Sequence, residues 1–128
     1  MCNSYRIQPR RSELAGLPGK VSAAAGTLGK AIVRKSDPGL VVLPDDSVAT
    51  MRWGFHRPFN PAINNTRSDK LDSPVWHDAW QQRRCVIPMT CFFEWGPGAN
   101  GRKQAHEFRH PADDFLWVAG IWEDNPAH

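Results

Sequence analysis

The chain is 128 residues long, which is the length of a single domain rather than of a multidomain protein. Its composition, with 41% hydrophobic and 23% charged residues, is typical of a globular domain and argues against a wholly disordered chain. No apolar run approaches the roughly 20 residues that a membrane-spanning helix needs, and the N-terminus lacks the pattern of a signal peptide. We therefore expect one intracellular domain over residues 1–128, with no membrane partner.

The net charge of +3 is unevenly distributed along the chain. Residues 1–35 contain seven basic residues and one acidic residue, so this segment alone carries a charge of +6. The chain has 11 arginines against 5 lysines, and the forked guanidinium group suits phosphate. The basic segment is therefore a candidate surface for a polyanion, and a solvated basic surface is the simpler alternative.

Turn residues divide the first half of the chain into short segments. Residues 10–39 are rich in Gly, Ala, Ser and Pro, which indicates loops around brief strands. Residues 40–43 and 48–53 are apolar, β-branched runs on either side of a turn at residues 44–47, as expected for an antiparallel hairpin. Residues 54–65 contain several Asn and Pro residues, so we expect an irregular loop there.

One helix is expected, over residues 74–83. Ser73 is a favourable cap, Pro74 is tolerated at the first helical position, and the apolar residues that follow recur at i, i+3 and i+4. Further strands are expected at residues 85–88, 92–95, 105–109 and 115–122, with a Gly/Pro turn at 96–102. Several strands around one helix, without regular βαβ alternation, predict an α+β fold.

The cysteines and histidines indicate neither disulfides nor a metal site. The chain has an odd number of cysteines and no Cys-x-x-Cys pair; the three are Cys2, Cys85 and Cys91. His106 and His110 are spaced four residues apart, but no third ligand follows from the pattern. We therefore expect reduced thiols, no metal and no cofactor.

Cys2 has the most distinctive chemistry, because removal of Met1 would leave it with a free α-amine beside its thiol. The amine, with an unperturbed pKa of ~7.7–8.0, is largely nucleophilic near neutral pH, and nearby positive charge activates the thiol. An aldehyde that meets this pair can form a Schiff base and then close to a thiazolidine ring. Two alternatives stay open: an N-terminal nucleophile for amide hydrolysis, and a cysteine with no role.

Two further segments and one tryptophan contain candidate functional side chains. Residues 64–68 combine amide and guanidinium donors that suit a phosphate or an oxyanion. In the expected strand at 92–95, Glu94 shares a face with Phe92, and an apolar setting raises a carboxyl pKa and favours general acid–base chemistry. Trp53 precedes a loop and is able to stack on a base. An exposed Glu94 at a sheet edge and a core Trp53 are the simpler alternatives.

Five motifs lie along the chain in a characteristic order. Met-Cys begins the chain, and the others follow at residues 51–54 (MRWG), 65–69 (NTRSD), 83–95 (RRCVIP followed by FFEW) and 119–123 (AGIWE). In this order and spacing they resemble the motifs of the SOS response-associated peptidase (SRAP) family. The resemblance extends over nearly the whole chain.

The resemblance implies a protein that processes abasic sites in DNA. Family members remove their own first methionine, bind single-stranded DNA or single-strand/duplex junctions, and trap the aldehyde of the ring-opened abasic sugar as a thiazolidine crosslink. By this resemblance Cys2 is the nucleophile, Asn65 holds it and the sugar in place, and Glu94 is the acid–base group. The implied DNA contacts are Arg67, Trp53, Arg52, Arg6 and Arg84.

The resemblance also implies a single α+β domain with mostly antiparallel strands in a barrel-like core. The catalytic histidine of the family lies in a downstream His-x-Arg-Met-Pro segment, so we expect the chain to be short at its C-terminus, with autopeptidase and lyase-like activity reduced where that histidine is absent. A monomer that is cytoplasmic and nucleoid-associated is expected. A noncatalytic single-stranded DNA-binding module and a peptidase that processes only itself are the alternative functions.

Overall fold

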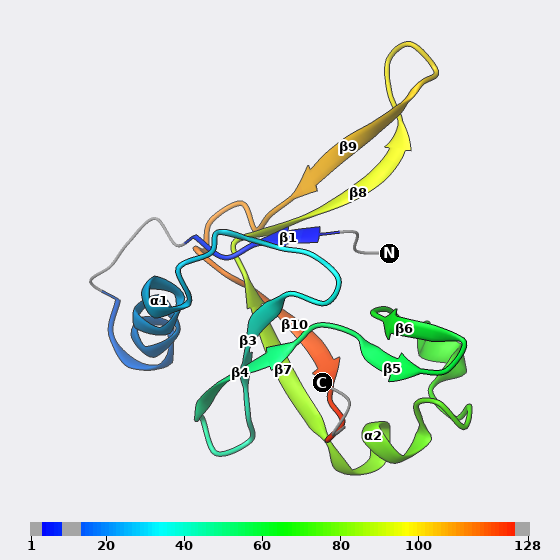
Figure 1. Ribbon diagram of the computed structural model, residues 1–128. Helices are drawn as coiled ribbons and strands as arrows, with labels where there is room; N and C mark the ends of the chain where they lie inside the picture. Colours follow the sequence, from blue (N-terminus) through cyan, green and yellow to red (C-terminus); the bar gives the residue numbers. More distant parts are fainter. Residues whose placement is uncertain (1–3, 9–13, 125–128) are drawn as a thin grey trace.

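The computed structural model describes residues 4–8 and 14–124 and contains two four-stranded sheets and a two-stranded ribbon (Figure 1). The first sheet has the order β2 (Ile32–Val33), β1 (Ser4–Arg6), β8 (Cys91–Pro97) and β9 (Lys103–Phe108). The second sheet has the order β10 (Leu116–Ile121), β7 (Arg84–Met89), β3 (Pro38–Val42) and β4 (Val48–Arg52). The ribbon consists of β5 (Phe55–Arg57) and β6 (Asn60–Ile63).

The shortest connection between the two sheets among the described strands is the single residue Thr90, because β7 ends at Met89 and β8 begins at Cys91. Thr90 lies between them and is buried. Its N–H donates to the carbonyl oxygen of Arg6 at 2.7 Å, and its hydroxyl oxygen accepts from the N–H of Gln8 at 2.8 Å. The backbone N–H and the hydroxyl group of the buried Thr90 therefore both have hydrogen-bond partners. Beyond the corner the β8–β9 hairpin projects away from the rest of the molecule (Figure 1).

The prediction of an α+β fold with mostly antiparallel strands is confirmed. All strand pairs among the described residues are antiparallel. The expected hairpin appears as β3 and β4, and the strands expected later in the chain appear as β7 to β10. The barrel-like core is wrong, since β2 and β9 end the first sheet, β10 and β4 end the second, and neither sheet closes on itself.

Helix α1 (Gly16–Leu28) was not expected, since it lies within residues 10–39, where loops around brief strands were predicted. Pro18 lies in its first turn, where a backbone N–H has no partner within the helix, so the proline costs no hydrogen bond there. Val21 and Ala25 are four residues apart and are both buried on one face. Gly29 ends the helix in the left-handed conformation, with φ of 67°.

Helix α2 (His77–Gln82) confirms the helix expected at residues 74–83, although it begins three residues later. The preceding residues form a turn in which the carbonyl oxygen of Ser73 accepts the N–H groups of both Trp76 and His77. Trp76 and Ala79 are buried against Phe55 in a small second cluster. Neither α1 nor α2 is long and apolar enough to cross a membrane, and these are the α-helices of the described residues.

The segment expected to be an irregular loop, residues 54–65, instead contains the β5–β6 ribbon. Phe55 pairs with Ile63 and Arg57 with Asn60, with a shift of register between the two pairs. The Asn60 side chain accepts the N–H of Ala62 at 3.0 Å and so supports the turn. The prolines of this segment are tolerated because a two-stranded ribbon consists only of edge strands.

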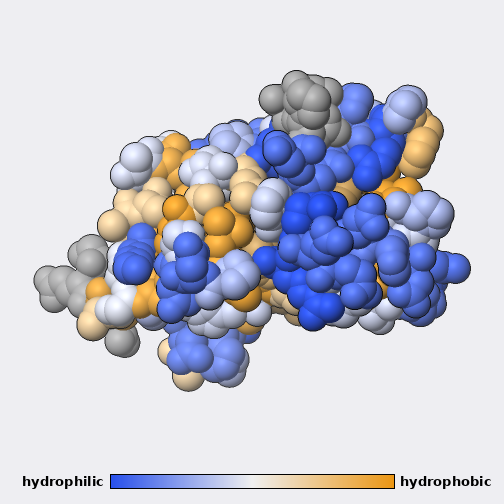
Figure 2. Space-filling model, turned by 90° about the horizontal axis from the view of Figure 1, so that it is seen from below, coloured by the Kyte–Doolittle hydropathy of each residue, from blue (hydrophilic) through white to orange (hydrophobic). Residues whose placement is uncertain are grey.

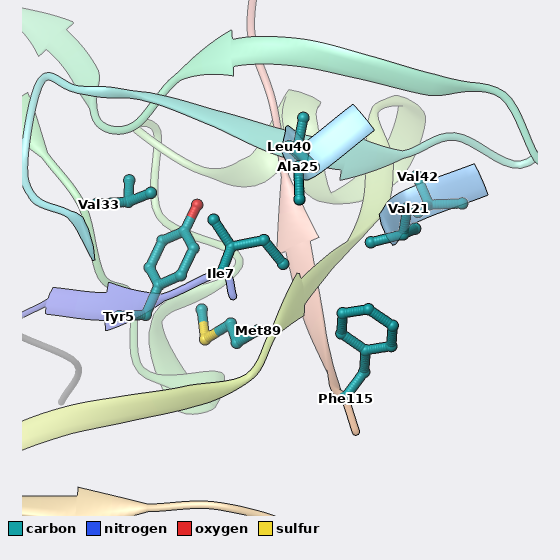
Figure 3. Packing of buried hydrophobic residues seen from close by; sticks show 9 residues of the cluster. All are labelled: Tyr5, Ile7, Val21, Ala25, Val33, Leu40, Val42, Met89 and Phe115. Atoms are coloured by element: carbon teal, nitrogen blue, oxygen red, sulfur yellow. The ribbon is translucent and has the colours of Figure 1, made fainter. Parts of the chain in front are cut away.

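The main core is shared by α1 and both sheets (Figure 3). Its buried members are Tyr5, Ile7, Val21, Ala25, Val33, Leu40, Val42, Met89 and Phe115. A side chain at Gly39 would collide with the Tyr5 hydroxyl, so glycine is needed where β1 crosses β3. The core thus holds the strand that follows the N-terminus against the second sheet.

Replacement of Leu40 tests this core. Leu40 is only 2% exposed, and Leu40→Ala is expected to lower the free energy of unfolding by about 2–5 kcal/mol in urea denaturation, because it removes buried surface and leaves a cavity. Thr50 pairs with Leu40 across β3 and β4 but is exposed, so Thr50→Ala should change stability by about 0.5 kcal/mol or less. Equal losses in the two variants would contradict the assignment of the core.

Candidate functional site

A cavity of about 890 Å³ lies where the second sheet meets the β5–β6 ribbon. Its walls come from β3, β4, β7, β8 and β10, together with the ribbon, α2 and the segment after β6. They are mainly apolar, with a small number of polar side chains, which is the usual character of a ligand pocket. Four of the residues to which the family resemblance gives a role line it: Arg52, Trp53, Asn65 and Glu94.

The cavity therefore brings together residues that are distant in the sequence. Arg52 and Trp53 end or follow β4, Asn65 follows β6, and Glu94 lies on β8. Cys2, the expected nucleophile, lies outside the described residues. The position and the role of Cys2 therefore remain predictions.

Both the side chain and the backbone of Trp53 make contacts that fix its position. Its indole N–H donates to the carbonyl oxygen of Asn64 at 3.2 Å, and its ring packs against Tyr5 in a T-shaped arrangement with centroids 5.2 Å apart. Its backbone N–H donates to the carbonyl oxygen of Asp37, and its own carbonyl oxygen accepts the N–H of Ser36. The half-buried ring is therefore part of the fold and of the cavity wall at once, so the two sequence-based alternatives for Trp53 do not exclude each other.

Asn65 is placed by the bond between Trp53 and Asn64, because that bond anchors the residue immediately before it. Asn65 is half-buried, and Thr66 and Ser68 continue the same wall of the cavity. Arg67 points elsewhere: its guanidinium forms two bonds to Asp69, at 3.0 and 2.9 Å, and its side chain is 70% exposed. Arg67 therefore lies on the surface beside the cavity, already paired with a carboxylate.

Glu94 faces the cavity together with Phe92, whereas Trp95 is exposed. This agrees with the alternation expected for the strand at 92–95. The Phe92 ring stacks on Phe108 of β9, with centroids 5.0 Å apart and planes 14° from parallel. Glu94 is half-buried and shares the cavity wall with Phe92.

Arg6 and Arg84 do not line the main cavity. Arg6 alternates with Tyr5 along β1, and its guanidinium lies 5.7 Å from the centre of the Phe93 ring. Its Nε is buried and has no hydrogen-bond partner among the described residues. Arg84 lies 3.9 Å from the centre of the Trp80 ring, and its Nε donates to the Trp80 carbonyl oxygen. DNA contacts by these two arginines remain predictions.

Arg84 instead lines a smaller cavity of about 390 Å³. The other lining residues are mostly apolar and come from α1, the β3–β4 turn, β7 and β10, among them the exposed Trp117. Viewed from below, hydrophobic residues gather toward the α1 side of the molecule and hydrophilic residues cover the α2 side (Figure 2). This second cavity has none of the polar residues predicted for catalysis.

Glu123 is a cavity residue whose structural role the sequence did not indicate. Its side chain is 12% exposed, and its two oxygens accept the backbone N–H of His56 at 2.9 Å and Nη1 of Arg57 at 2.7 Å. Arg57 also donates to the carbonyl oxygens of His56 and Val75. The pair therefore ties the end of β10 to the ribbon and to the segment before α2. Its partners are more than 60 positions apart, so no local pattern predicts it.

The two described cysteines are not suited to nucleophilic chemistry. Cys85 lines the main cavity, but burial raises the pKa of its thiol to about 11. Burial raises the pKa of Cys91 as well, and a hydrogen bond to Glu107 adds to this effect. A buried thiol with a raised pKa forms little thiolate near neutral pH.

The described residues include no group of three His, Cys, Asp or Glu side chains able to hold a metal ion. The two histidines at helical spacing each interact locally: a ring nitrogen of His106 lies 3.1 Å from the Pro97 carbonyl oxygen, and Nδ1 of His110 accepts the N–H groups of Ala112 and Asp113.

A family model for the SOS response associated peptidase (SRAP) matches residues 1–128 of the chain. The chain belongs to the SRAP family. The family is described as that of the SOS response associated peptidases. No curated protein matches the chain.

Two solved structures share the fold of this SRAP chain. A crystal structure of a protein from Bordetella bronchiseptica has a TM-score of 0.69 and 19% sequence identity, and the match covers 95% of this chain and 64% of the other. A crystal structure of a protein from Bacteroides thetaiotaomicron has a TM-score of 0.71 and 19% identity, with coverages of 94% and 59%. The SRAP chain thus spans less than two thirds of the length of either protein.

Thiol labelling tests the contrast between the cysteines. With a pKa of about 11, Cys85 has about 0.1% thiolate at pH 8, so iodoacetamide should leave Cys85 unmodified in the native protein. The same result is expected for Cys91, whose pKa is also raised. Both should be alkylated in denaturant, as measured by peptide mass spectrometry. Labelling of Cys85 in the native protein at the denatured rate would contradict its burial.

A double-mutant cycle tests the pair between Glu123 and Arg57. With alanine at each position, the coupling measured by urea denaturation should be about 1–3 kcal/mol, because the pair is largely buried and shares further hydrogen bonds. The pair between Arg67 and Asp69 is the control, since its side chains are 70% and 57% exposed and its coupling should stay below about 1 kcal/mol. A coupling no larger than that of the control would show that Glu123 does not anchor the ribbon.

Proposed function

We propose that this SRAP chain binds single-stranded DNA and captures abasic sites covalently through Cys2. The observation that supports the proposal is the meeting of Trp53, Asn65 and Glu94 in one cavity. These side chains provide an aromatic wall, an amide and a carboxylate. Such groups are required to hold a sugar and to transfer its protons. The basic composition of residues 1–35 suits a polyanionic partner.

The reaction begins after hydrolysis of the bond between Met1 and Cys2, which leaves a free α-amine on Cys2. This amine attacks the aldehyde carbon of the ring-opened sugar, and a water molecule leaves as the C=N bond of a Schiff base forms. The thiol sulfur then adds to the same carbon, and its proton passes to the nitrogen. The products are one thiazolidine and one water, so neither an oxidant nor a cofactor is consumed.

Glu94 is assigned the proton transfers in this sequence. A carboxyl group beside Phe92 in a partly apolar cavity can protonate the departing hydroxyl group and take a proton from the thiol. The amide of Asn65 is assigned the role of orienting the sugar. Trp53 and Phe92 limit the access of water from their side of the cavity.

We propose that the protein is a monomer that acts in the cytoplasm at the nucleoid.

Crosslinking to a defined oligonucleotide tests the proposal. Protein whose first residue is confirmed as Cys2 by intact mass is incubated with single-stranded DNA that contains one abasic site and is analysed on a denaturing gel. A shifted band is expected with the native protein and none with Cys2→Ala or with undamaged DNA. Glu94→Gln should slow crosslinking about 10²–10⁴-fold, because it removes the acid–base group.

The matched control is Glu107→Gln, which changes a carboxylate on β9 that bonds to Cys91 and Arg109. Its crosslinking rate should stay close to that of the native protein. Absence of a band that depends on Cys2 would overturn the covalent proposal, and salt-sensitive DNA binding without a crosslink would favour the noncatalytic binding module instead.

A further inference from the structure

The connection between β2 and β3 carries a cluster of positive charge. We call residues 34–37 the basic turn, because Arg34 and Lys35 are both exposed there. Lys30 precedes the turn, and Arg52, from the end of β4, bonds to it through Nη2 and the Ser36 hydroxyl at 3.1 Å. Four cations therefore lie on or beside this short segment.

The shape of the basic turn is set by its own hydrogen bonds. The N–H of Arg34 donates to the Asp37 carboxylate at 2.9 Å, and the N–H of Asp37 donates back to the Arg34 carbonyl oxygen at 3.0 Å. Ser36 adopts a left-handed conformation, with φ of 72°, which completes the reversal of the chain. A turn closed in this way holds its side chains at defined positions.

The basic turn is bonded to the candidate site through Trp53. The N–H of Ser36 donates to the Trp53 carbonyl oxygen at 2.8 Å, and the N–H of Trp53 donates to the Asp37 carbonyl oxygen at 2.9 Å. Trp53 and Arg52 both line the cavity that contains Asn65 and Glu94. In Figure 1 this connection, drawn in cyan, extends toward the β5–β6 ribbon, which supplies another wall of the cavity.

The charges of this cluster do not cancel. Asp37 is the acidic residue of the turn, and its carboxylate pairs with Lys30 at 2.8 Å. The hydrogen bond from Lys30 lowers the pKa of Asp37, so this carboxylate stays ionised and paired at neutral pH. Within the described part of the chain, Arg34 and Lys35 form no ion pair. Three positive charges are therefore left uncompensated beside the cavity, where they attract a polyanion.

We propose that the basic turn binds the phosphodiester backbone of the DNA strand next to the nucleotide held in the cavity. This inference rests on the proposed function and adds to it a second surface, which contacts the DNA strand outside the cavity. Phosphates rather than bases are the partner, because the turn offers guanidinium and ammonium groups and no aromatic side chain. The contact is therefore independent of base sequence.

The salt dependence of DNA binding tests the inference. Binding of undamaged single-stranded DNA is followed by fluorescence anisotropy over a series of salt concentrations, for the native protein and for Arg34→Gln/Lys35→Gln. Each phosphate contact contributes about 0.7 to the slope of log affinity against log salt for a single strand, so the double variant should lose about 1.4. Crosslinking at saturating abasic DNA should keep its native rate, because neither residue lines the cavity.

The matched control is Arg102→Gln/Lys103→Gln, which removes the same charge from exposed positions at the tip of the β8–β9 hairpin. This control should keep the native slope. Thermal unfolding of both double variants confirms that each is folded, as expected for exposed side chains.

The outcomes separate this inference from the function on which it rests. One outcome would overturn only the inference about the basic turn. In it, the native protein binds and crosslinks DNA, and the Arg34→Gln/Lys35→Gln variant keeps the native slope of log affinity against log salt. Equal losses of slope in both double variants would also overturn it, because the effect would then be one of net charge. Failure of the native protein to bind DNA at any salt concentration would overturn both proposals.

Discussion

The indole N–H of Trp53 reaches the carbonyl oxygen of Asn64, and the arrangement of the cavity depends on this one hydrogen bond. The bond connects the end of β4 to the segment after β6, two parts of the chain that belong to different sheets. The backbone of Trp53 is bonded in turn to residues 36 and 37, and its ring meets Tyr5 of β1. Three separate segments therefore take their positions from one side chain and its peptide groups. A half-buried donor of this kind is costly to leave without a partner, which favours this one arrangement.

Much of the sheet structure could be predicted from sequence, because alternation and turn residues are local properties. The β3–β4 hairpin and the strands β7, β8 and β10 have apolar runs separated by turns, and the structure confirms them together with the more polar strand β9. Helix α1 was missed because Gly and Pro at its start resemble a loop, whereas its stability comes from burial of Val21 and Ala25 in the core. The ribbon was missed because Asn and Pro residues hide the pairing of Phe55 with Ile63.

For the candidate site, the sequence supplied the residues but not their arrangement. Motif order indicated Trp53, Asn65 and Glu94, and the structure places them on one cavity. The position of Arg67 beside Asp69 and the orientation of Arg6 toward Phe93 depend on side-chain packing that no pattern reports. The same holds for Glu123, whose partners in β5 are set by the way the ribbon docks. Long-range pairing of this kind is a property of the folded chain, so local sequence patterns do not contain it.

The walls of the cavity differ in stiffness, because one of them is the β5–β6 ribbon. Residues of β3, β7 and β10 belong to a four-stranded sheet whose strands support one another, whereas β5 and β6 pair only with each other among the described strands. An isolated two-stranded hairpin is only marginally stable, so the ribbon relies on its docking contacts. The cavity therefore has one firm side and one compliant side. A bound ligand that needs more room would be accommodated by displacement of the ribbon. The width of the opening therefore depends on the few polar contacts that hold that side.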